Sequence, residues 1–439
     1  MENKLPDMRA WIYDALCAVI LKGTYSNLYL KDHLDELPEN QRPLATRIFY
    51  GTIQNWGLCD YVISKHTDRT PDPKIRILLA MTIYQIIFLK KIPDYAAVDA
   101  AVKLAHKRFG KASGYVNGVL RSVLRDKVKL PSDTLERLSV RYSIPLWLIR
   151  LWENHYGLEK AEQMAKTSNA VLPVYVRRNP RRIGEEEFFA DPEIERMDAD
   201  MGRFTGSSAA RHPFYRQGRM SVQDPGSFEI VKFLDVQDGE SVLDVCAAPG
   251  TKSMAIAERL DSGAVDASDV HEHRVELIKT DARRLHLKNV HASVRDARNL
   301  SDAGLYDRIL CDVPCTGYGV LARKPDIKLK LKPETLDSLL PLQAEILEEA
   351  AAHLKPDGKL VYSTCTLDRK ENEKQVEKFL DCHPDWQLEE EQTVFPDETR
   401  NGFYMARLSR REQSKAADDG MKQNIQRFVR SNQASKFNQ

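Results

Sequence analysis

Two kinds of hydrophobic pattern divide the chain. Up to about residue 126, apolar residues recur at spacings of three and four, which is typical of amphipathic helices. Glycine and proline separate these segments, so this part of the chain is predicted to form a compact helical bundle. Its helices are expected at residues 10–21, 42–54, 59–64, 74–89, 95–109 and 112–123.

The second pattern alternates short apolar runs of strand character with helical segments. The strand-like runs cover residues 241–245, 308–311 and 359–362. The helical segments cover residues 253–260, 274–285 and 342–354. This alternation predicts a mostly parallel sheet with crossover helices, whose ligand crevice lies at the carboxyl ends of the strands.

Between these regions the chain predicts further helix over residues 132–167 and one strand at 174–176. Four arginines follow the start of that strand closely. Such a basic strand end suits contact with a nucleic-acid phosphate, or a solvated sheet edge that discourages aggregation, equally well. These arginines are Arg177, Arg178, Arg181 and Arg182.

The expected organisation is a bundle followed by a small basic subdomain and an α/β domain. The bundle occupies residues 1–130, and linker helices with the small basic subdomain occupy 131–221. The α/β domain occupies residues 222–410, and a polar tail over 411–439 is expected to be disordered.

Composition and charge narrow the functional class only slightly. Residues 1–150 carry 23 Lys and Arg against 15 Asp and Glu, a surplus that suits phosphate or a solvated surface. The first ten residues are polar, and the most apolar run, residues 77–89, is too short to cross a bilayer. The seven cysteines form no CxxC pair, which argues against a metal site or a disulfide framework. A cytoplasmic monomer without membrane or metal is expected.

A loop containing a single glycine follows the first strand-like run of the α/β domain, in the order Asp244-Val-Cys-Ala-Ala-Pro-Gly250-Thr-Lys252. A dinucleotide requires Gly-x-Gly-x-x-Gly, so NAD and FAD are disfavoured. Asp269 and Asp296 follow the next two strand-like segments and suit ribose hydroxyls and an adenine amino group. The order of these acids after the glycine loop favours a site for S-adenosylmethionine over the alternative that each acid only caps a helix.

Two further loops pair an acid with thiols. Asp312-Val-Pro-Cys315 and Thr364-Cys365-Thr366 both follow strand-like runs, so their cysteines are expected to share one crevice. Carbon 5 of cytosine becomes nucleophilic only after a thiolate adds to carbon 6, and an acid at N3 assists this addition. The two loops therefore favour cytosine-5 methylation.

Together these motifs resemble the RNA cytosine-5 methyltransferases of the Nol/Nop/Sun class. The helical leader, which ends in Tyr115-Val-Asn-Gly-Val-Leu-Arg121, resembles the NusB-like domain. This domain order is similar to that of the bacterial 16S ribosomal RNA enzymes of the Sun/Fmu type. The resemblance implies a NusB-like all-α domain followed by a Rossmann-like class I methyltransferase domain.

The resemblance also implies roles for individual residues. Cys365 would be the nucleophile, Cys315 would assist product release, and Asp312 would position the base. Arg323 and Lys328 would line the RNA side of the cleft, together with the four arginines above. Residues expected to contact S-adenosylmethionine are Cys246, Ala247, Ala248, Pro249, Gly250, Thr251, Lys252, Asp269, Asp296 and Asp312.

The implied substrate is an unpaired or flipped cytosine in 16S rRNA, position 967 in the usual bacterial numbering. A tRNA cytosine-5 methyltransferase is an alternative that the helical leader disfavours. A noncatalytic RNA-binding assembly factor is a third hypothesis, disfavoured by the intact acids and thiols. Asn401 replaces an aspartate that is common in the family, and its role is open at this stage.

Overall fold

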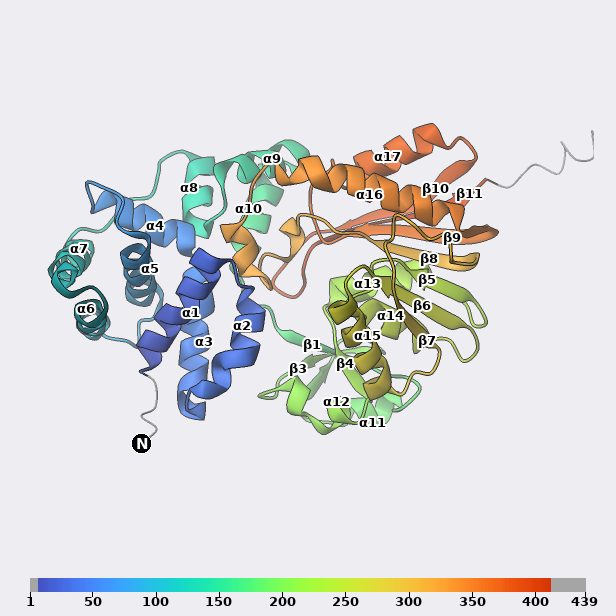
Figure 1. Cartoon of the computed structure of the whole chain (residues 1–439), viewed down its shortest axis with the longest axis horizontal. Helices are drawn as coiled ribbons and strands as arrows, with labels where there is room; N and C mark the ends of the chain where they lie inside the picture. Colours follow the sequence, from blue (N-terminus) through green and yellow to red (C-terminus); the bar gives the residue numbers. More distant parts are fainter. Residues whose placement is uncertain (1–6, 412–439) are drawn as a thin grey trace, which may run out of the picture.

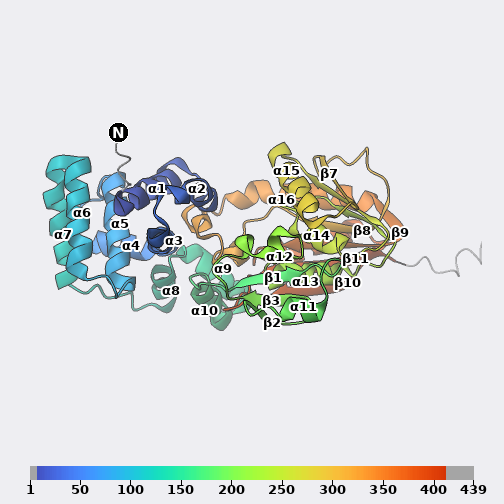
Figure 2. The ribbon, with the colours of Figure 1, turned by 90° about the horizontal axis from the view of Figure 1, so that it is seen from below.

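The computed structural model describes residues 7–411. The chain forms an elongated molecule with a helical bundle at one end and an α/β domain at the other (Figure 1 and Figure 2). Except for Arg411, the predicted tail over 411–439 lies outside the described residues, so its disorder stays a prediction.

Helices α1 to α7 build the bundle; hydrophobic periodicity predicted six of them, and it missed the short helix α2. Asp7 accepts a hydrogen bond from the Arg9 backbone N–H at 2.9 Å and so begins α1, and Gly23 ends this helix with a φ of 74°. The bounds of the seven helices are α1 Met8–Lys22, α2 Ser26–His33, α3 Arg42–Gln54, α4 Trp56–Lys65, α5 Pro73–Phe88, α6 Asp94–Phe109 and α7 Ser113–Arg125.

The most apolar run of the sequence lies in α5, at the centre of the bundle core. Ile77, Leu78 and Leu79 of this helix are fully buried against the neighbouring helices. Throughout residues 7–411, every helix is too short or too polar to cross a membrane.

Three linker helices connect the bundle to the α/β domain, and their apolar side chains share a buried core with the α/β domain. These are α8 Thr134–Tyr142, α9 Leu146–Tyr156 and α10 Leu158–Thr167. Leu148 and Trp152 of α9 belong to the same buried cluster as Tyr318 and Leu367 of the α/β domain. The linker therefore packs directly against loops that follow strands of the larger sheet.

A small antiparallel sheet follows, in the strand order β2-β3-β1-β4. Only β1 was predicted, because the other strands have three or four residues and show too little alternation to be recognised. The elements of this region are β1 Val174–Arg178, α11 Glu185–Phe189, β2 Ile194–Arg196, β3 Met201–Phe204, α12 Pro213–Arg216 and β4 Met220–Val222.

The α/β domain contains a seven-stranded sheet with the strand order β10-β11-β9-β8-β5-β6-β7. Strands β5 to β9 pair in parallel, whereas β10 and β11 are antiparallel additions, so the predicted mostly parallel sheet is confirmed. The strands are β5 Ser241–Asp244, β6 Ala264–Asp269, β7 Val290–Val294, β8 Tyr306–Asp312, β9 Leu354–Thr364, β10 Trp386–Val394 and β11 Phe403–Arg410.

Helices cover both faces of this sheet (Figure 1). Helices α13, α14 and α15 lie on one face and α16 and α17 on the other, each layer with its own buried apolar cluster. Their bounds are α13 Pro225–Leu234, α14 Thr251–Ala257, α15 Glu272–Leu285, α16 Thr335–Ala352 and α17 Glu373–Cys382. This is the layered arrangement expected of a Rossmann-like fold.

A buried ion pair joins the small sheet to the α/β domain. Arg177 of β1 donates to both carboxylate oxygens of Glu258 at 3.0 and 2.9 Å, and both side chains are 0% exposed. Gln223 also accepts a hydrogen bond from the Arg177 guanidinium. Because both charges are removed from water, each depends on the other for its stability.

Replacing Arg177 with methionine is therefore expected to lower the free energy of unfolding by about 3–5 kcal/mol, because it leaves Glu258 buried without its partner. The double variant Arg177→Met/Glu258→Leu should recover most of this loss. Urea unfolding followed by circular dichroism measures both effects. A double variant no more stable than the single one would contradict this role for the pair.

Candidate active site

One pocket of about 490 Å³ opens at the carboxyl edge of the large sheet. Its walls come from the segments that follow β5, β6, β7, β8 and β9. This is where a parallel sheet collects functional side chains from loops that are distant in sequence. The predicted site residues that line this pocket are Cys246, Ala248, Asp269, Asp296, Asp312, Cys315 and Cys365.

Two thiols face each other in this pocket. The Sγ atoms of Cys315 and Cys365 lie 3.3 Å apart. The parallel pairing of β8 and β9, with Asp312 opposite Ser363, brings their following loops side by side. The structure thus brings together the two cysteines that the sequence analysis placed in one crevice.

The hydrogen bond between the sulfurs makes these thiols unequal. It lowers the pKa of Cys365 below its ordinary value, although burial opposes this effect. The same contact raises the pKa of Cys315 well above its ordinary value, and burial acts in the same direction. Lys324 and Lys252 place positive charge near Cys365, whereas Glu371 places negative charge near Cys315. The surroundings therefore favour a thiolate at Cys365 and a protonated thiol at Cys315.

A buried hydrogen-bond network holds the two cysteine loops together. Thr316 and Thr366 each follow one of the cysteines, and their hydroxyl oxygens lie 2.6 Å apart. Glu371 accepts hydrogen bonds from the Thr316 backbone N–H at 3.0 Å, from the Thr316 hydroxyl, and from Gln343 Nε2 at 2.9 Å. Sequence reasoning missed Glu371, which lies in a polar run before α17 that resembles an ordinary helix start.

Asp312 is held by two side chains beside the cysteines. Lys252 Nζ lies 2.5 Å from Asp312 Oδ2, and Ser363 Oγ donates to Oδ1 at 3.0 Å. Burial acts to lower the pKa of Lys252, but Asp312 outweighs this effect and the pKa is raised. Lys252 therefore remains a cation. Its ion pair with Asp312 links the glycine loop to the pocket that contains Cys315 and Cys365, which we call the thiol pocket.

The glycine loop has the backbone that its sequence requires. Gly250 has a φ of 105°, and a Cβ atom there would lie 3.3 Å from Ile278 Cγ1 of α15. Ala247 is buried behind the pocket wall, Pro249 precedes Gly250, and Thr251 and Lys252 begin α14. A glycine at position 250 thus allows both the turn and the close helix packing.

The acids of the pocket fit a nucleoside ligand that carries positive charge. Asp269 Oδ1 accepts the His271 N–H at 3.1 Å, which fixes the turn before α15, and Asp269 also lines the pocket. Hydrogen bonds from Arg298 lower the pKa of Asp296. Asp244 Oδ1 is buried without a partner in the described chain, and burial raises the pKa of Asp244 to about 7. An unpartnered carboxylate oxygen beside the glycine loop suits a ligand with hydrogen-bond donors.

The cysteine of the glycine loop has a different environment from the other two pocket cysteines. Burial raises the pKa of Cys246 well above its ordinary value, and nearby acids act in the same direction. This thiol therefore stays protonated, in keeping with a role in the pocket wall.

The arginines predicted to bind RNA have other partners or lie away from the thiols. Arg177 is enclosed in its ion pair with Glu258 and has no surface for RNA. Arg178 pairs with Asp200 at 3.0 Å, within the same small sheet. Arg177 thus attaches the small sheet to the α/β domain and Arg178 stabilises the small sheet itself, which sequence alone did not indicate.

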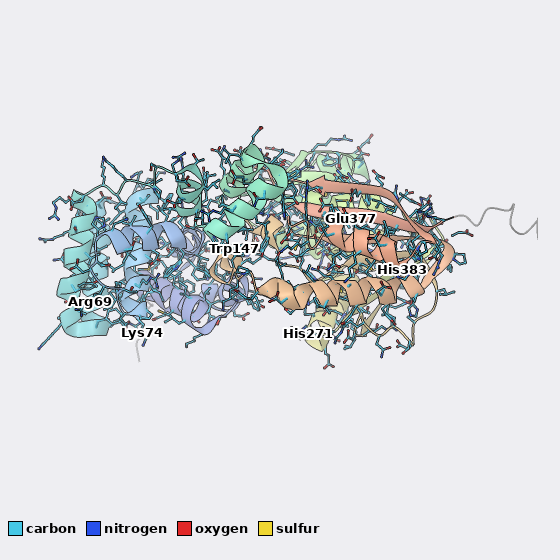
Figure 3. The ribbon with its side chains drawn as sticks, turned by 90° about the horizontal axis from the view of Figure 1, so that it is seen from above. Arg69, Lys74, Trp147, His271, Glu377 and His383 are labelled. Atoms are coloured by element: carbon cyan, nitrogen blue, oxygen red, sulfur yellow. The ribbon has the colours of Figure 1, made fainter. Side chains whose placement is uncertain are left out.

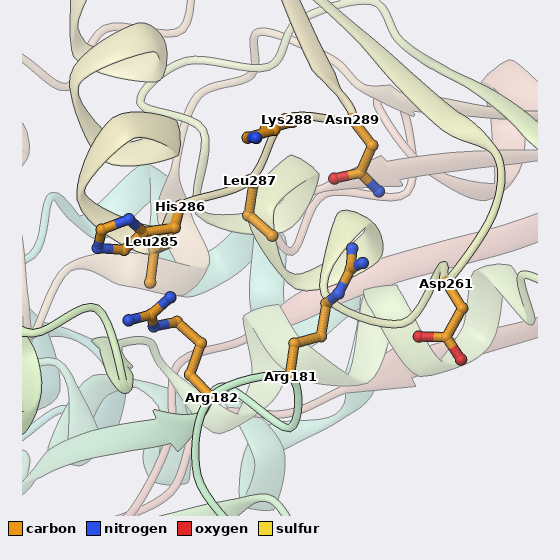
Figure 4. A pocket seen from close by; sticks show the side chains of 8 residues that line it. All are labelled: Arg181, Arg182, Asp261, Leu285, His286, Leu287, Lys288 and Asn289. Carbon is orange, nitrogen blue, oxygen red and sulfur yellow. The ribbon is translucent and has the colours of Figure 1, made fainter.

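Arg181 and Arg182 line a separate hollow of about 390 Å³ (Figure 4). Its other residues precede β6 and β7, so it lies at the amino edge of the parallel strands, opposite the thiols. Both side chains are exposed, and Arg181 also donates to the Leu260 carbonyl at 3.0 Å.

The segment from Arg323 to Lys328, which is predicted to line the RNA side of the cleft, packs against the bundle and the linker region. Lys328 is buried and donates to the Tyr142 carbonyl at 2.8 Å and to Asn169 Oδ1 at 2.5 Å. Arg323 donates to the carbonyls of Leu172 and Pro173. Only the intervening Lys324, which sequence reasoning did not single out, lines the thiol pocket.

Asn401 has a structural partner. Its Nδ2 donates to Asp224 Oδ2 at 2.8 Å, and Asp224 begins α13 by accepting the Gly226 N–H. Asn401 thus anchors the helix start that precedes the first strand of the large sheet.

Within residues 7–411, one group of three side chains has the spacing of metal ligands: Asp191, Glu193 and His212. His212 Nδ1 accepts the Phe214 N–H at 3.2 Å, which leaves Nε2 to donate to Asp191 at 3.2 Å. This hydrogen bonding accounts for the group without a metal.

Both the helical bundle and the α/β domain match known protein families. The model of the NusB family matches residues 6–125, and the model described as 16S rRNA methyltransferase RsmB/F matches residues 231–421. The chain is 37% identical to the probable ribosomal RNA small subunit methyltransferase B of Bacillus subtilis (strain 168), over 88% of this chain and 90% of that protein. It is 30% identical to ribosomal RNA small subunit methyltransferase B of Vibrio cholerae serotype O1, over 92% and 98%.

Solved structures share the fold. The crystal structure of PH0851 has a TM-score of 0.77 and 25% identity, and the match covers 92% of this chain and 99% of that chain. NSun6 from Pyrococcus horikoshii, determined with SFG, has a TM-score of 0.56 at 20% identity, covering 61% and 98%.

The inequality of the two thiols is testable without any substrate. Cys315→Ala removes the hydrogen-bond donor, so the pKa of Cys365 should rise and its thiolate should appear only at higher pH. Iodoacetamide alkylation of Cys365, followed by mass spectrometry across pH, should shift to the alkaline side in the variant. The exposed Cys382 serves as an internal control whose profile should not change. A Cys365 profile that stays in place, or moves to the acid side, would contradict the conclusion that Cys315 lowers the pKa of Cys365.

Proposed function

We infer that this chain, which belongs to the RsmB/F family of 16S rRNA methyltransferases, transfers a methyl group from S-adenosylmethionine to carbon 5 of a cytosine in 16S rRNA. The family resemblance stated from the motifs is confirmed. The observation that carries the chemical proposal is the pair of thiols, 3.3 Å apart, in a pocket that also contains Asp269, Asp296 and Asp312.

We assign the cofactor to the part of the pocket at the carboxyl ends of β5, β6 and β7. The loop from Cys246 to Lys252 would hold its methionine portion, Asp269 its ribose hydroxyls, and Asp296 its adenine amino group. When bound, S-adenosylmethionine supplies an electrophilic methyl group on a positively charged sulfur. The acids of the pocket complement that charge, and the single glycine leaves no cradle for a pyrophosphate.

The cysteine pair provides a nucleophile for the base. The Cys365 thiolate adds to carbon 6 of cytosine, forming a carbon–sulfur bond and making carbon 5 nucleophilic. Asp312, held by Lys252 and Ser363, faces the same space and would stabilise the base at N3 during this addition. Carbon 5 would then bond to the methyl carbon as the methyl–sulfur bond breaks, and the electron pair of that bond would stay on the departing sulfur, leaving a neutral thioether.

Release reverses the addition. A base accepts the proton from carbon 5, and the electron pair of the broken carbon–hydrogen bond restores the double bond between carbons 5 and 6. The sulfur of Cys365 departs as a thiolate. Cys315 is positioned to assist this step because its sulfur lies within hydrogen-bond distance of Cys365. A cytosine must be unpaired or flipped to reach the pair, and position 967 of 16S rRNA is the proposed target.

Replacement of either cysteine should separate their roles. Cys365→Ala should abolish methyl transfer to 16S rRNA, whereas Cys315→Ala should accumulate a covalent protein–RNA complex that survives denaturing electrophoresis. Bisulfite sequencing of rRNA and tRNA from a strain lacking the gene identifies the methylated nucleotide. Full activity of Cys365→Ala would refute the nucleophile, and loss of methylation only in tRNA would favour the alternative substrate.

Glu371 should matter for turnover rather than for cofactor binding. Glu371→Ala removes the acceptor that holds Thr316, and a displacement of about 1 Å between reacting groups lowers kcat by about 100-fold. The affinity for S-adenosylmethionine, measured by calorimetry, should stay unchanged. Glu377→Ala is the matched control, because Glu377 lies on the exposed side of α17 (Figure 3) and, among residues 7–411, forms an ion pair only with Lys374. Equal kcat values for the two variants would contradict the role of Glu371.

A further inference from the structure

A second, larger cleft lies outside the thiol pocket. It measures about 1060 Å³ and is lined by α3 and α5 of the bundle, by the linker region, and by Ala322, Arg323 and Pro325 of the α/β domain. We call it the interdomain cleft. The proposed methyl transfer does not use it.

The charge of the interdomain cleft suits a polyanion. Three arginines line it, namely Arg47, Arg141 and Arg323, and no aspartate or glutamate of the described chain does so. Arg47 and Arg141 are exposed, and neither forms an ion pair with any residue in the range 7–411. Unpaired guanidinium groups in a concave surface favour phosphate.

The apolar lining of the same cleft suits nucleobases. Tyr84 and Phe88 stack at 5.2 Å between ring centroids, and Phe88 is 38% exposed. Val171 is 92% exposed on the linker side of the cleft. Accessible aromatic and aliphatic surface beside arginines is the combination by which proteins bind single-stranded nucleic acid.

A single loop separates this cleft from the thiol pocket. Ala322, Arg323 and Pro325 line the interdomain cleft, whereas Lys324 lines the pocket that contains Cys315 and Cys365. The two spaces therefore lie on either side of one stretch of backbone. An RNA strand that places a base at the thiols can cross Lys324 and enter the interdomain cleft within a short distance.

We propose that the interdomain cleft binds unpaired nucleotides of the same rRNA strand next to the target cytosine. Their bases pack on Phe88 and Val171, their phosphates contact Arg47 and Arg141, and Lys324 contacts the strand where it crosses between the two spaces. The proposal rests on the proposed function and extends it, because it makes the bundle one wall of a substrate site.

Charge reversal tests the phosphate contacts. The variant Arg47→Glu/Arg141→Glu should raise the KM for unmethylated, transcribed 16S rRNA about tenfold or more, with kcat and S-adenosylmethionine affinity near those of the unmodified protein. The dependence of log KM on log salt concentration should fall by about 2, one for each lost contact. Arg69→Glu is the matched control, since Arg69 lies at the outer end of the bundle, away from the cleft (Figure 3), and should change neither quantity.

Cross-linking tests the position of the strand. Full-length protein carrying a photoreactive phenylalanine at position 88 should cross-link to the transcribed rRNA within a few nucleotides of the methylated cytosine, as mapped by primer extension. The same group at position 69 should give no such product. Phe88→Ala should raise KM roughly tenfold through lost stacking.

The outcomes separate this inference from the proposed function. If the unmodified protein methylates no cytosine in 16S rRNA, the proposed function fails. If it does so, but the Arg47/Arg141 variant matches Arg69→Glu in KM and salt dependence, the interdomain cleft does not bind the strand. A cross-link at position 88 to a ribosomal protein in assembled subunits, without any to RNA, would also overturn the inference.

Discussion

The candidate active site depends on one short contact, the 3.3 Å between the sulfurs of Cys315 and Cys365. Two half-buried thiols this close cannot both ionise at low cost, so one proton between them stabilises a single thiolate. The charges on either side determine which sulfur keeps the proton and which is the thiolate. The parallel pairing of β8 and β9 creates the contact, and the network around Glu371 preserves it.

The loop over residues 322–330 connects that contact to the helical bundle. Asp326 is buried and accepts a hydrogen bond from Ser26 of α2 at 2.7 Å, and Lys328 reaches carbonyl oxygens of α3 and α8. Lys324, in the same loop, faces the thiols. Because buried polar groups are costly to leave unpaired, the bundle and the pocket are held in a fixed relation. An RNA segment bound in the interdomain cleft, as proposed, would thereby lie at a defined distance from Cys365.

The sequence predicted most of the fold because its strongest signals are local. Helical periodicity identified the bundle, and alternating strands and helices identified the mostly parallel sheet with its crevice at the strand ends. That rule alone brought Asp269, Asp296, Asp312, Cys315 and Cys365 to one pocket, where the structure places them. The three short strands of the small sheet escaped recognition, since three or four residues carry too little pattern.

By itself, the sequence determined the class of fold, the chemical groups of the pocket and the family, because each is encoded in neighbouring residues. Only the tertiary structure decided which basic residues are available to a ligand. Nothing in the local sequence distinguishes Arg177 and Lys328 from Arg47 and Arg141. The first two are enclosed by partners distant in the chain, whereas the other two face an open cleft. It also decided that Glu371 supports the thiol pair. Burial and pairing depend on which segments meet in space, and no local pattern records that meeting.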